Sequence, residues 1–289
     1  MKHIRPLFYE EPSSVSEASE MLSTPGSLVL AGGTDITVML RRKPMDGVTL
    51  VNLKRIPGLD GIRKMEDGSL RLGALVTVGH MGRVLTAPEH AALRIACNSL
   101  GTPAVRNLAT LGGNIGRASP ASDVIPALLS LDAVVILESA GGSRRVPLEQ
   151  LLQGPGRLDS RPGEFVTAVE LPPREGGVGS YWKAGRIRGA DCALAGVGVS
   201  FCWDGDTIVD PRVAMTSVGP TCLRSAGAER VLRGARLDEE VMRAAADAAA
   251  GDARPITDLR ASAAYRKELV RGLLMKNLRS LAAQERRSC

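Results

Sequence analysis

The sequence predicts an α+β fold, because strand and hairpin patterns occupy most of the chain and a run of helical patterns ends it. Short apolar segments bounded by turn residues recur up to about residue 218, whereas apolar spacings of three and four dominate after Pro220. The chain has 289 residues, of which 44% are hydrophobic and 24% are charged. That length is sufficient for two or three units that each bury a core.

The first unit, about residues 1–55, is predicted to be a small helix-and-strand subdomain. Ser14 followed by Glu17 has the spacing of a capping box, and the apolar helical face after it ends at Pro25-Gly26. The strands expected here are Ser27–Ala31 and Val48–Leu53, and the apolar segment between them is Ile36–Leu40. The first strand runs directly into the loop Gly32-Gly33-Thr34-Asp35.

The second unit, about residues 56–175, begins with a predicted hairpin. Asp67-Gly68 separates two apolar segments, and an Asp-Gly pair favours a tight turn. The elements expected after the hairpin are helices at Pro88–Leu100 and Val124–Leu131 and strands at Ala133–Leu137 and Phe165–Leu171. Pro172-Pro173 and Gly176-Gly177 then predict a linker.

The third unit, residues 178–289, is predicted to pair a hairpin with helices. The strands expected are Ala193–Trp203 and Ile208–Val218, joined at Asp204-Gly205-Asp206. The helices expected are Arg224–Leu232, Glu239–Ala250 and Ser262–Leu281. The last helix carries an apolar stripe, which is more typical of a core-facing side than of a cofactor site.

Composition excludes several classes of protein. No apolar run reaches the length of a membrane span, and Met1–Pro6 lacks the apolar core of a signal peptide, so the cytoplasm is the expected location. The five cysteines are scattered without a Cys-x-x-Cys pair, which argues against a zinc or iron–sulfur site held by this chain alone. The three histidines form no constellation with other candidate catalytic groups.

The net charge of +6 is concentrated at the C-terminal end. Residues 254–289 hold nine basic and three acidic side chains, which accounts for the whole excess. A basic helix can bind nucleic acid, but Tyr265 is the only aromatic residue in this segment. A solvated face or a docking surface is therefore the preferred interpretation, and no nucleic acid is expected as a partner.

Two similar glycine loops are the sharpest features of the sequence. Ala31-Gly32-Gly33-Thr34-Asp35 and Leu111-Gly112-Gly113-Asn114-Ile115 each place two glycines before a polar residue. Glycine allows positive φ and leaves no Cβ in the way, so successive backbone N–H groups can converge on an anion. Either loop alone is compatible with an ordinary turn, whereas two loops, both expected at strand ends, favour a clamp on a pyrophosphate. Because aromatic residues make up only 3%, a flat cofactor is expected to be held by backbone and aliphatic groups.

The common nucleotide motifs do not fit these loops. The sequence contains no GxGxxG after the first strand and no GxxxxGK[ST]. Gly196-Val197-Gly198 lies in a strand pattern and lacks the third glycine. An ordinary Rossmann or P-loop site is therefore excluded.

These loops, together with Ala118-Ser119-Pro120-Ala121-Ser122-Asp123 and Arg260-Ala261-Ser262-Ala263-Ala264-Tyr265-Arg266, resemble the FAD-binding medium subunit of molybdenum hydroxylases. The family includes flavin subunits of carbon monoxide dehydrogenase, xanthine dehydrogenase and 4-hydroxybenzoyl-CoA reductase. The resemblance implies a two-subdomain FAD-binding domain of the vanillyl-alcohol-oxidase type over residues 1–175, with subdomains at about 1–55 and 56–175. It also implies a C-terminal domain of the CO dehydrogenase flavoprotein type over residues 178–289, with a small antiparallel sheet and helices.

The resemblance also implies roles for particular residues. The first loop would hold the FAD pyrophosphate through Leu30, Ala31, Gly32, Gly33, Thr34, Asp35 and Ile36, and the second through Thr110, Gly112, Gly113 and Asn114. Leu100 would lie near the flavin ring, and Asp123 would bond the ribityl or ribose hydroxyls. Lys183 would approach the flavin or would be a surface lysine. Arg117 departs from the resemblance, because relatives often have a small residue at this position, and it would sense a phosphate or face solvent. Leu194 stands where some relatives have a flavin-contacting lysine, which disfavours direct use of NAD.

The function implied is an oxidoreductase subunit that relays electrons. FAD would bind to this chain, whereas the molybdenum cofactor and two [2Fe–2S] clusters would lie in a large and a small partner subunit, in a dimer of heterotrimers. No residue of this chain is expected to be catalytic or to bind a metal. The alternatives are a free-standing flavin-dependent oxidoreductase and a non-catalytic interaction module. Substrate and final electron acceptor are not predicted.

Overall fold

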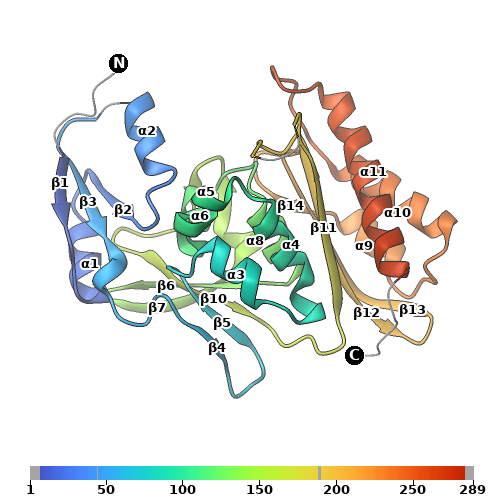
Figure 1. The fold of residues 1–289 in the computed structure, drawn as a ribbon, viewed down its shortest axis with the longest axis horizontal. Coiled ribbons are helices and arrows are strands. Elements are labelled where there is room, and N and C mark those ends of the chain that lie inside the picture. The colour runs from blue at the N-terminus through green and yellow to red at the C-terminus, as the bar shows by residue number, and fades with distance from the viewer. Residues whose placement is uncertain (1–6, 44, 188–189, 284–289) are drawn as a thin grey trace.

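A computed structural model describes residues 7–43, 45–187 and 190–283 and confirms the α+β fold class (Figure 1). The segment Met1–Pro6 and the basic residues Arg286 and Arg287 of the tail lie outside the described residues. Among the helices that are described, none combines the length and the hydropathy needed to cross a membrane. Three sheets of three, five and four strands follow one another along the chain, and a two-stranded ribbon accompanies the second. The unit boundaries near residue 55 and between residues 175 and 178 stay predictions. In the sequence, the first sheet lies before the first boundary, the second sheet lies between the two, and the third sheet lies after the second.

The first sheet is parallel, in the order β1-β3-β2. Its elements are β1 (Leu7–Glu10), α1 (Val15–Leu22), β2 (Ser27–Leu30), α2 (Ile36–Arg42), β3 (Val48–Asn52) and the short helix η1 (Leu53–Arg55). The Ser14 side chain caps α1 by accepting from the amide of Glu17, and the Glu17 carboxylate accepts from the amide of Ser13. The predicted capping residue and the two predicted strands are therefore present.

The second sheet is antiparallel, in the order β4-β5-β10-β6-β7, and helices cover it. Its strands are β4 (Ile62–Lys64), β5 (Leu70–Gly73), β6 (Val134–Ser139), β7 (Gly142–Pro147) and β10 (Phe165–Leu171), and the ribbon is β8 (Leu152–Gly154) with β9 (Arg157–Leu158). Its helices are α3 (Val78–Val84), η2 (Pro88–His90), α4 (Ala91–Ser99), α5 (Pro103–Leu108), α6 (Leu111–Arg117), α7 (Val124–Ser130) and α8 (Leu148–Leu151).

The third sheet is antiparallel, in the order β11-β12-β13-β14. It comprises β11 (Val178–Ala184), β12 (Ala195–Asp204), β13 (Thr207–Thr216) and β14 (Leu223–Arg224), followed by α9 (Ala226–Leu232), α10 (Glu239–Asp252) and α11 (Ala263–Ala282). The predicted start of a helix at Arg224 is wrong, because Leu223 and Arg224 pair with β13 and the side chain of Ser225 caps α9 instead.

The two faces of β12 differ in side-chain size, and this difference decides what packs on each. Val197, Val199 and Phe201 belong to the core shared with the C-terminal helices. The alternating residues Gly196, Gly198 and Ser200 face the other way, because successive residues of a strand point to opposite sides. A Cβ atom on Gly198 would lie 3.1 Å from the carbonyl oxygen of Pro126, so glycine lets α7 approach the sheet backbone.

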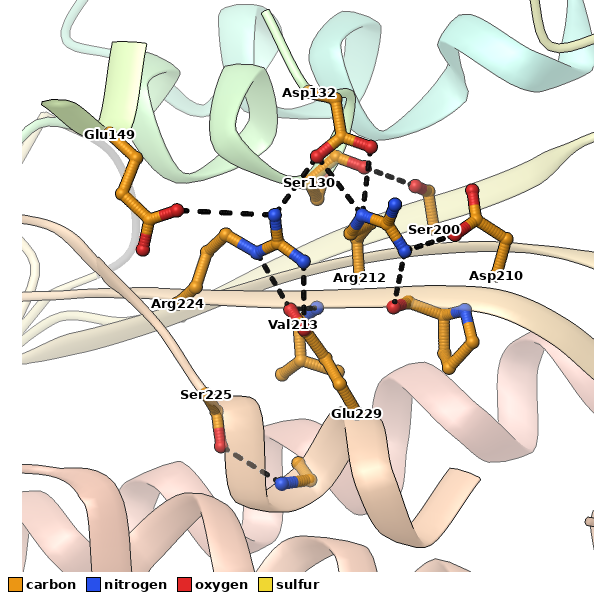
Figure 2. A network of polar contacts seen from close by, with 12 residues as sticks. Ser130, Asp132, Glu149, Ser200, Asp210, Arg212, Val213, Arg224, Ser225 and Glu229 are labelled. Carbon is orange, nitrogen blue, oxygen red and sulfur yellow. Dashed lines mark hydrogen bonds and ion pairs between the residues drawn. The ribbon is translucent and has the colours of Figure 1, made fainter. Parts of the chain in front are cut away.

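Helix α7 and the third sheet are joined by a network of charges (Figure 2). Asp132, just after α7, accepts from Arg212 Nε at 2.8 Å and from Arg224 Nη1 at 3.0 Å. Arg224 also donates to both carboxylate oxygens of Glu229 in α9. Burial would lower the pKa of both arginines, but their carboxylate partners outweigh it and the pKa of each is raised. The network therefore fixes the third sheet against the second unit.

Asp132→Asn is expected to destabilise the protein by about 2–3 kcal/mol, because it leaves two partly buried guanidinium groups without their shared carboxylate. Asparagine tolerates the positive φ of +51° at this position, so the backbone is not strained. Urea unfolding would measure the loss. Glu149→Gln is the matched control, because the exposed Glu149 lies 4.0 Å from Arg224, and it should cost less than about 0.5 kcal/mol. Equal losses in both variants would contradict the assignment.

Candidate functional site

The structure brings the two glycine loops into contact. A Cβ atom on Gly32 would lie 1.9 Å from the carbonyl oxygen of Leu108, so only glycine allows this approach. A Cβ atom on Gly113 would lie 3.9 Å from that of Ala31. Residues that are about 80 positions apart in the sequence therefore form one surface, as the pairing of the loops predicted.

The first loop connects β2 to α2 and presents unpaired backbone N–H groups. Gly33 has a φ of +76°, the conformation expected of a glycine in an anion-binding turn. Within the described part of the chain, the N–H groups of Gly32, Gly33, Thr34 and Asp35 donate to no protein acceptor. Thr37 closes the loop, since its N–H and its hydroxyl both donate to the carbonyl of Gly33. Four adjacent donors are thus available to a ligand.

The second loop differs from the expectation. It lies at the N-terminus of α6 rather than at a strand end, and Thr110 is the capping residue. The N–H groups of Leu111, Gly112, Gly113 and Asn114 all donate within the chain, to Val76, Ala74, the Thr110 hydroxyl and the Thr110 carbonyl. The expectation of free backbone donors is therefore wrong for this loop. What α6 offers is bare backbone, because Gly113 and Gly116 are exposed and a Cβ atom on Gly116 would meet nothing within 4 Å.

A pocket of about 760 Å³ lies between the second and third units. One wall includes Asn98, Ser99, residues 101–103 and Arg106, and the opposite wall includes residues 183–187, Ala190 and Asp191. Pro103 and Arg106 of α5 line the pocket, while Leu108 at the other end of the same short helix contacts Gly32. Helix α5 therefore connects the pocket to the glycine loops.

Ser99 and Gly101 line this pocket, whereas the partly buried side chain of Leu100 between them packs against the hydrophobic core. The Arg106 Nη1 atom donates to the carbonyls of Leu100 and Gly101, both at 2.9 Å. Gly101 has a φ of +48°, so the turn that holds Leu100 is a constrained one. Arg106 is not among the residues predicted from the sequence, although Thr102-Pro103 is a recognisable helix start that places it on α5.

Asp123 and Lys183, two predicted site residues, form a buried ion pair across the two units. The Lys183 Nζ atom lies 2.7 Å from one carboxylate oxygen of Asp123, and the Tyr181 hydroxyl donates to the other at 2.8 Å. The side chains of Lys183 and Asp123 are only 12% and 8% exposed, so Lys183 is not a surface lysine. Burial raises the pKa of Asp123, and Lys183 and Tyr181 oppose this effect. Burial and the adjacent carboxylate also raise the pKa of Tyr181, which the sequence reasoning missed.

The remaining predicted residues lie in or beside the two glycine loops. Leu30 ends β2, Ile36 begins α2, and the carbonyl oxygen of the Asn114 side chain accepts from the Ser122 hydroxyl at 2.7 Å. Ser122 directly precedes Asp123, so this bond ties the second glycine loop to the Asp123 ion pair. The described residues contain no group of three or more histidine, cysteine or acidic side chains with metal-binding geometry.

Comparison with known families agrees with this arrangement. Residues 2–174 match the FAD binding domain in molybdopterin dehydrogenase, and residues 180–281 match the CO dehydrogenase flavoprotein C-terminal domain. The chain belongs to this flavoprotein family. It is accordingly an FAD-binding oxidoreductase subunit of the molybdenum hydroxylase type, and the predicted family is confirmed.

Relatives cover nearly the whole length. The glyceraldehyde dehydrogenase medium chain of Sulfolobus acidocaldarius is 30% identical over 95% of this chain and 98% of its own. The carbon monoxide dehydrogenase medium chain of Hydrogenophaga pseudoflava is 30% identical over 96% of this chain and 97% of its own. A solved structure of carbon monoxide dehydrogenase from the same organism superposes with a TM-score of 0.91 at 30% identity, covering 97% of this chain and 99% of that one.

Lys183→Met is expected to make stability depend more steeply on pH. Without the lysine, the pKa of the buried Asp123 rises further above its unfolded value, so the folded state favours the protonated carboxyl and loses stability as pH rises through the folded pKa. The loss should be small at about pH 5 and about 3 kcal/mol at about pH 8. Urea unfolding at both pH values would test this, with the exposed Lys64→Met as control. A loss that did not change with pH would contradict the prediction.

Proposed function

We propose that the first glycine loop and the bare face of α6 hold the pyrophosphate of FAD, and that the pocket between the units takes the flavin end. The observation that carries this proposal is the set of free N–H groups from Gly32 to Asp35, which opens beside the exposed glycines of α6. A charge-assisted hydrogen bond contributes about 1.5–3 kcal/mol, so a few such donors hold a dinucleotide without an arginine fork. The second loop then contributes its shape and the Thr110 hydroxyl, not backbone donors.

The residues around the pocket have positioning roles in this proposal. Arg106 holds the carbonyl of Leu100, and the part of the Leu100 side chain that is not buried would contact the flavin ring. Asp123 keeps unused acceptor capacity beside Lys183 and Tyr181, which suits a bond from a ribityl or ribose hydroxyl. The ion pair joins Asp123 of the second unit to Lys183 of the third. FAD binding at this point therefore depends on the relative position of the two units.

We propose that the chain relays electrons from the [2Fe–2S] clusters of a small partner subunit, through FAD, to an external acceptor. Bound FAD supplies the electron-transfer chemistry, and this chain supplies binding, orientation and exclusion of water. Substrate would be oxidised at a molybdenum cofactor in a large partner subunit, and three subunits, doubled, would form the complex. The relatives named as medium chains support this arrangement. The cytoplasm stays the predicted location.

The basic C-terminal segment gives no support to the alternative of a nucleic-acid module. Arg266 is buried and donates to Leu194, Ser217 and Asp258. Arg260 pairs with Asp258 and Arg271 with Asp247, and Lys276 lies over the ring of Trp182. Much of the basic charge described there is thus engaged within the chain.

Gly33→Leu is expected to abolish FAD binding, because its side chain would occupy the space that the loop leaves for phosphate. Gly58→Leu is the matched control, since Gly58 has a similar φ of +81° against +76° and open surroundings, so both variants carry the same backbone strain. The measurement is the visible absorbance of flavin retained after desalting of the full chain. Retention of FAD by Gly33→Leu, or equal loss in both variants, would overturn the assigned site.

The relay predicts that the FAD-loaded chain alone does not turn over organic substrates named for its relatives, such as glyceraldehyde or xanthine, with an artificial acceptor. When the chain is mixed anaerobically with a photoreduced [2Fe–2S] partner subunit, its flavin absorbance should bleach. The Gly33→Leu chain, lacking FAD, controls for absorbance changes in the partner. Rapid turnover by the isolated chain would instead favour a free-standing flavin-dependent oxidoreductase.

A further inference from the structure

Arg117, the last residue of α6, lies across from the acidic end of the first glycine loop. Its Nε atom is 3.9 Å from a carboxylate oxygen of Asp35. The two side chains are 47% and 64% exposed, so the contact is long and solvated and contributes little to stability by itself. Its guanidinium group is therefore available to a stronger acceptor.

The position of Arg117 follows from the way the first loop runs along α6. Gly113 lies beside Ala31 at one end of the loop, and Arg117 lies beside Asp35 at the other. Positions four apart share one face of a helix, so Gly113 and Arg117 both face the loop, with the bare backbone of Gly116 next to Arg117. Arg117 therefore lies at one end of the surface that the free N–H groups of the loop face.

The turn that carries Gly156 lies next to the arginine side chain. A Cβ atom on Gly156 would lie 3.4 Å from the Arg117 Nη1 atom, and the Gly156 N–H donates to the carbonyl of Ala118 at 3.0 Å. The turn that carries Gly156 is thus fixed to the end of α6, and its missing side chain makes room for the guanidinium.

Electrostatics then requires a cation at this point. Asp35 places a negative charge within the loop whose N–H groups are available to an anion, and a pyrophosphate would add more. A carboxylate beside a bound phosphate repels it unless a positive charge stands close to both. Arg117 is in that position, and its planar group can bond two oxygens at once.

We infer that Arg117 is a phosphate-binding residue of the dinucleotide site, and that Asp35 holds its guanidinium in place before the ligand arrives. This inference rests on the proposed FAD site. It goes beyond that site because it assigns a side-chain anchor and gives Asp35 a positioning role through Arg117.

A double-mutant cycle in the full-length chain tests the inference. The variants are Arg117→Ala, Asp35→Asn and the combination, and Arg55→Ala is the control, because Arg55 is an exposed arginine that pairs with Glu11. FAD affinity is measured by ultrafiltration, and ADP is the competitor because it carries a pyrophosphate without the flavin. Arg117→Ala should weaken both ligands about tenfold to a hundredfold and should lessen the dependence of affinity on salt. The loss should persist in the Asp35→Asn background, and Arg117→Lys should restore part of it.

Two outcomes would overturn the inference and leave the proposed function standing. One is FAD affinity unchanged by Arg117→Ala. The other is a loss that disappears in the Asp35→Asn background, which would mean that Arg117 only neutralises Asp35. If the parent chain and the Arg55→Ala control both fail to bind FAD and ADP, the proposed function fails and the inference fails with it.

Discussion

The burial of α7 between helices of the second unit and the third sheet is the constraint on which both the fold and the site depend. All seven residues of this helix are buried, and it packs on the glycine face of β12 and on β13. A carboxylate that forms ion pairs with the third unit lies at each end of this helix. Asp123 precedes its first turn and pairs with Lys183, while Asp132 follows its last turn and pairs with Arg212 and Arg224. A shift of α7 would therefore disturb the site and the interface together.

The pocket also depends on the position of α7, because its two walls belong to the two units that α7 joins. Further contacts fix the walls: the Ser217 N–H and the Thr216 hydroxyl both donate to the carbonyl of Pro120, at 2.7 and 2.9 Å. Arg266 completes the arrangement from α11, donating to the carbonyls of Leu194 and Ser217. This explains why a motif near the end of the chain accompanies glycine loops near its beginning. The buried guanidinium of Arg266 holds the strand ends that frame Lys183 and Asp191.

Elements with strong local signals were predictable from the sequence. The capped helix after Ser14, the Asp67-Gly68 hairpin and the long α11 all have patterns that tertiary packing reinforces. The short helices α3, α5 and α6 were missed, because they have six or seven residues and two of them contain several glycines. They form because Thr77, Thr102 and Thr110 cap them and because the surrounding core holds them. Strand β11 was missed as well, and with it the partnership of Tyr181 with Asp123, which only the folded chain brings together.

The two glycine loops show why a motif locates a site more reliably than it explains one. Their sequences are alike, but the glycines serve three different needs. Only Gly33 requires a positive φ, whereas Gly32 and Gly112 allow backbone or side-chain atoms of neighbouring segments to approach closely. Gly113 and Gly116 leave the surface of α6 bare. Because Val76, Ala74 and Thr110 accept from the backbone donors of the second loop, the proposed anion-binding donors lie in the first loop. The similarity of the two loops predicted that they would meet, and the hydrogen bonds within the chain show which of them keeps free backbone donors.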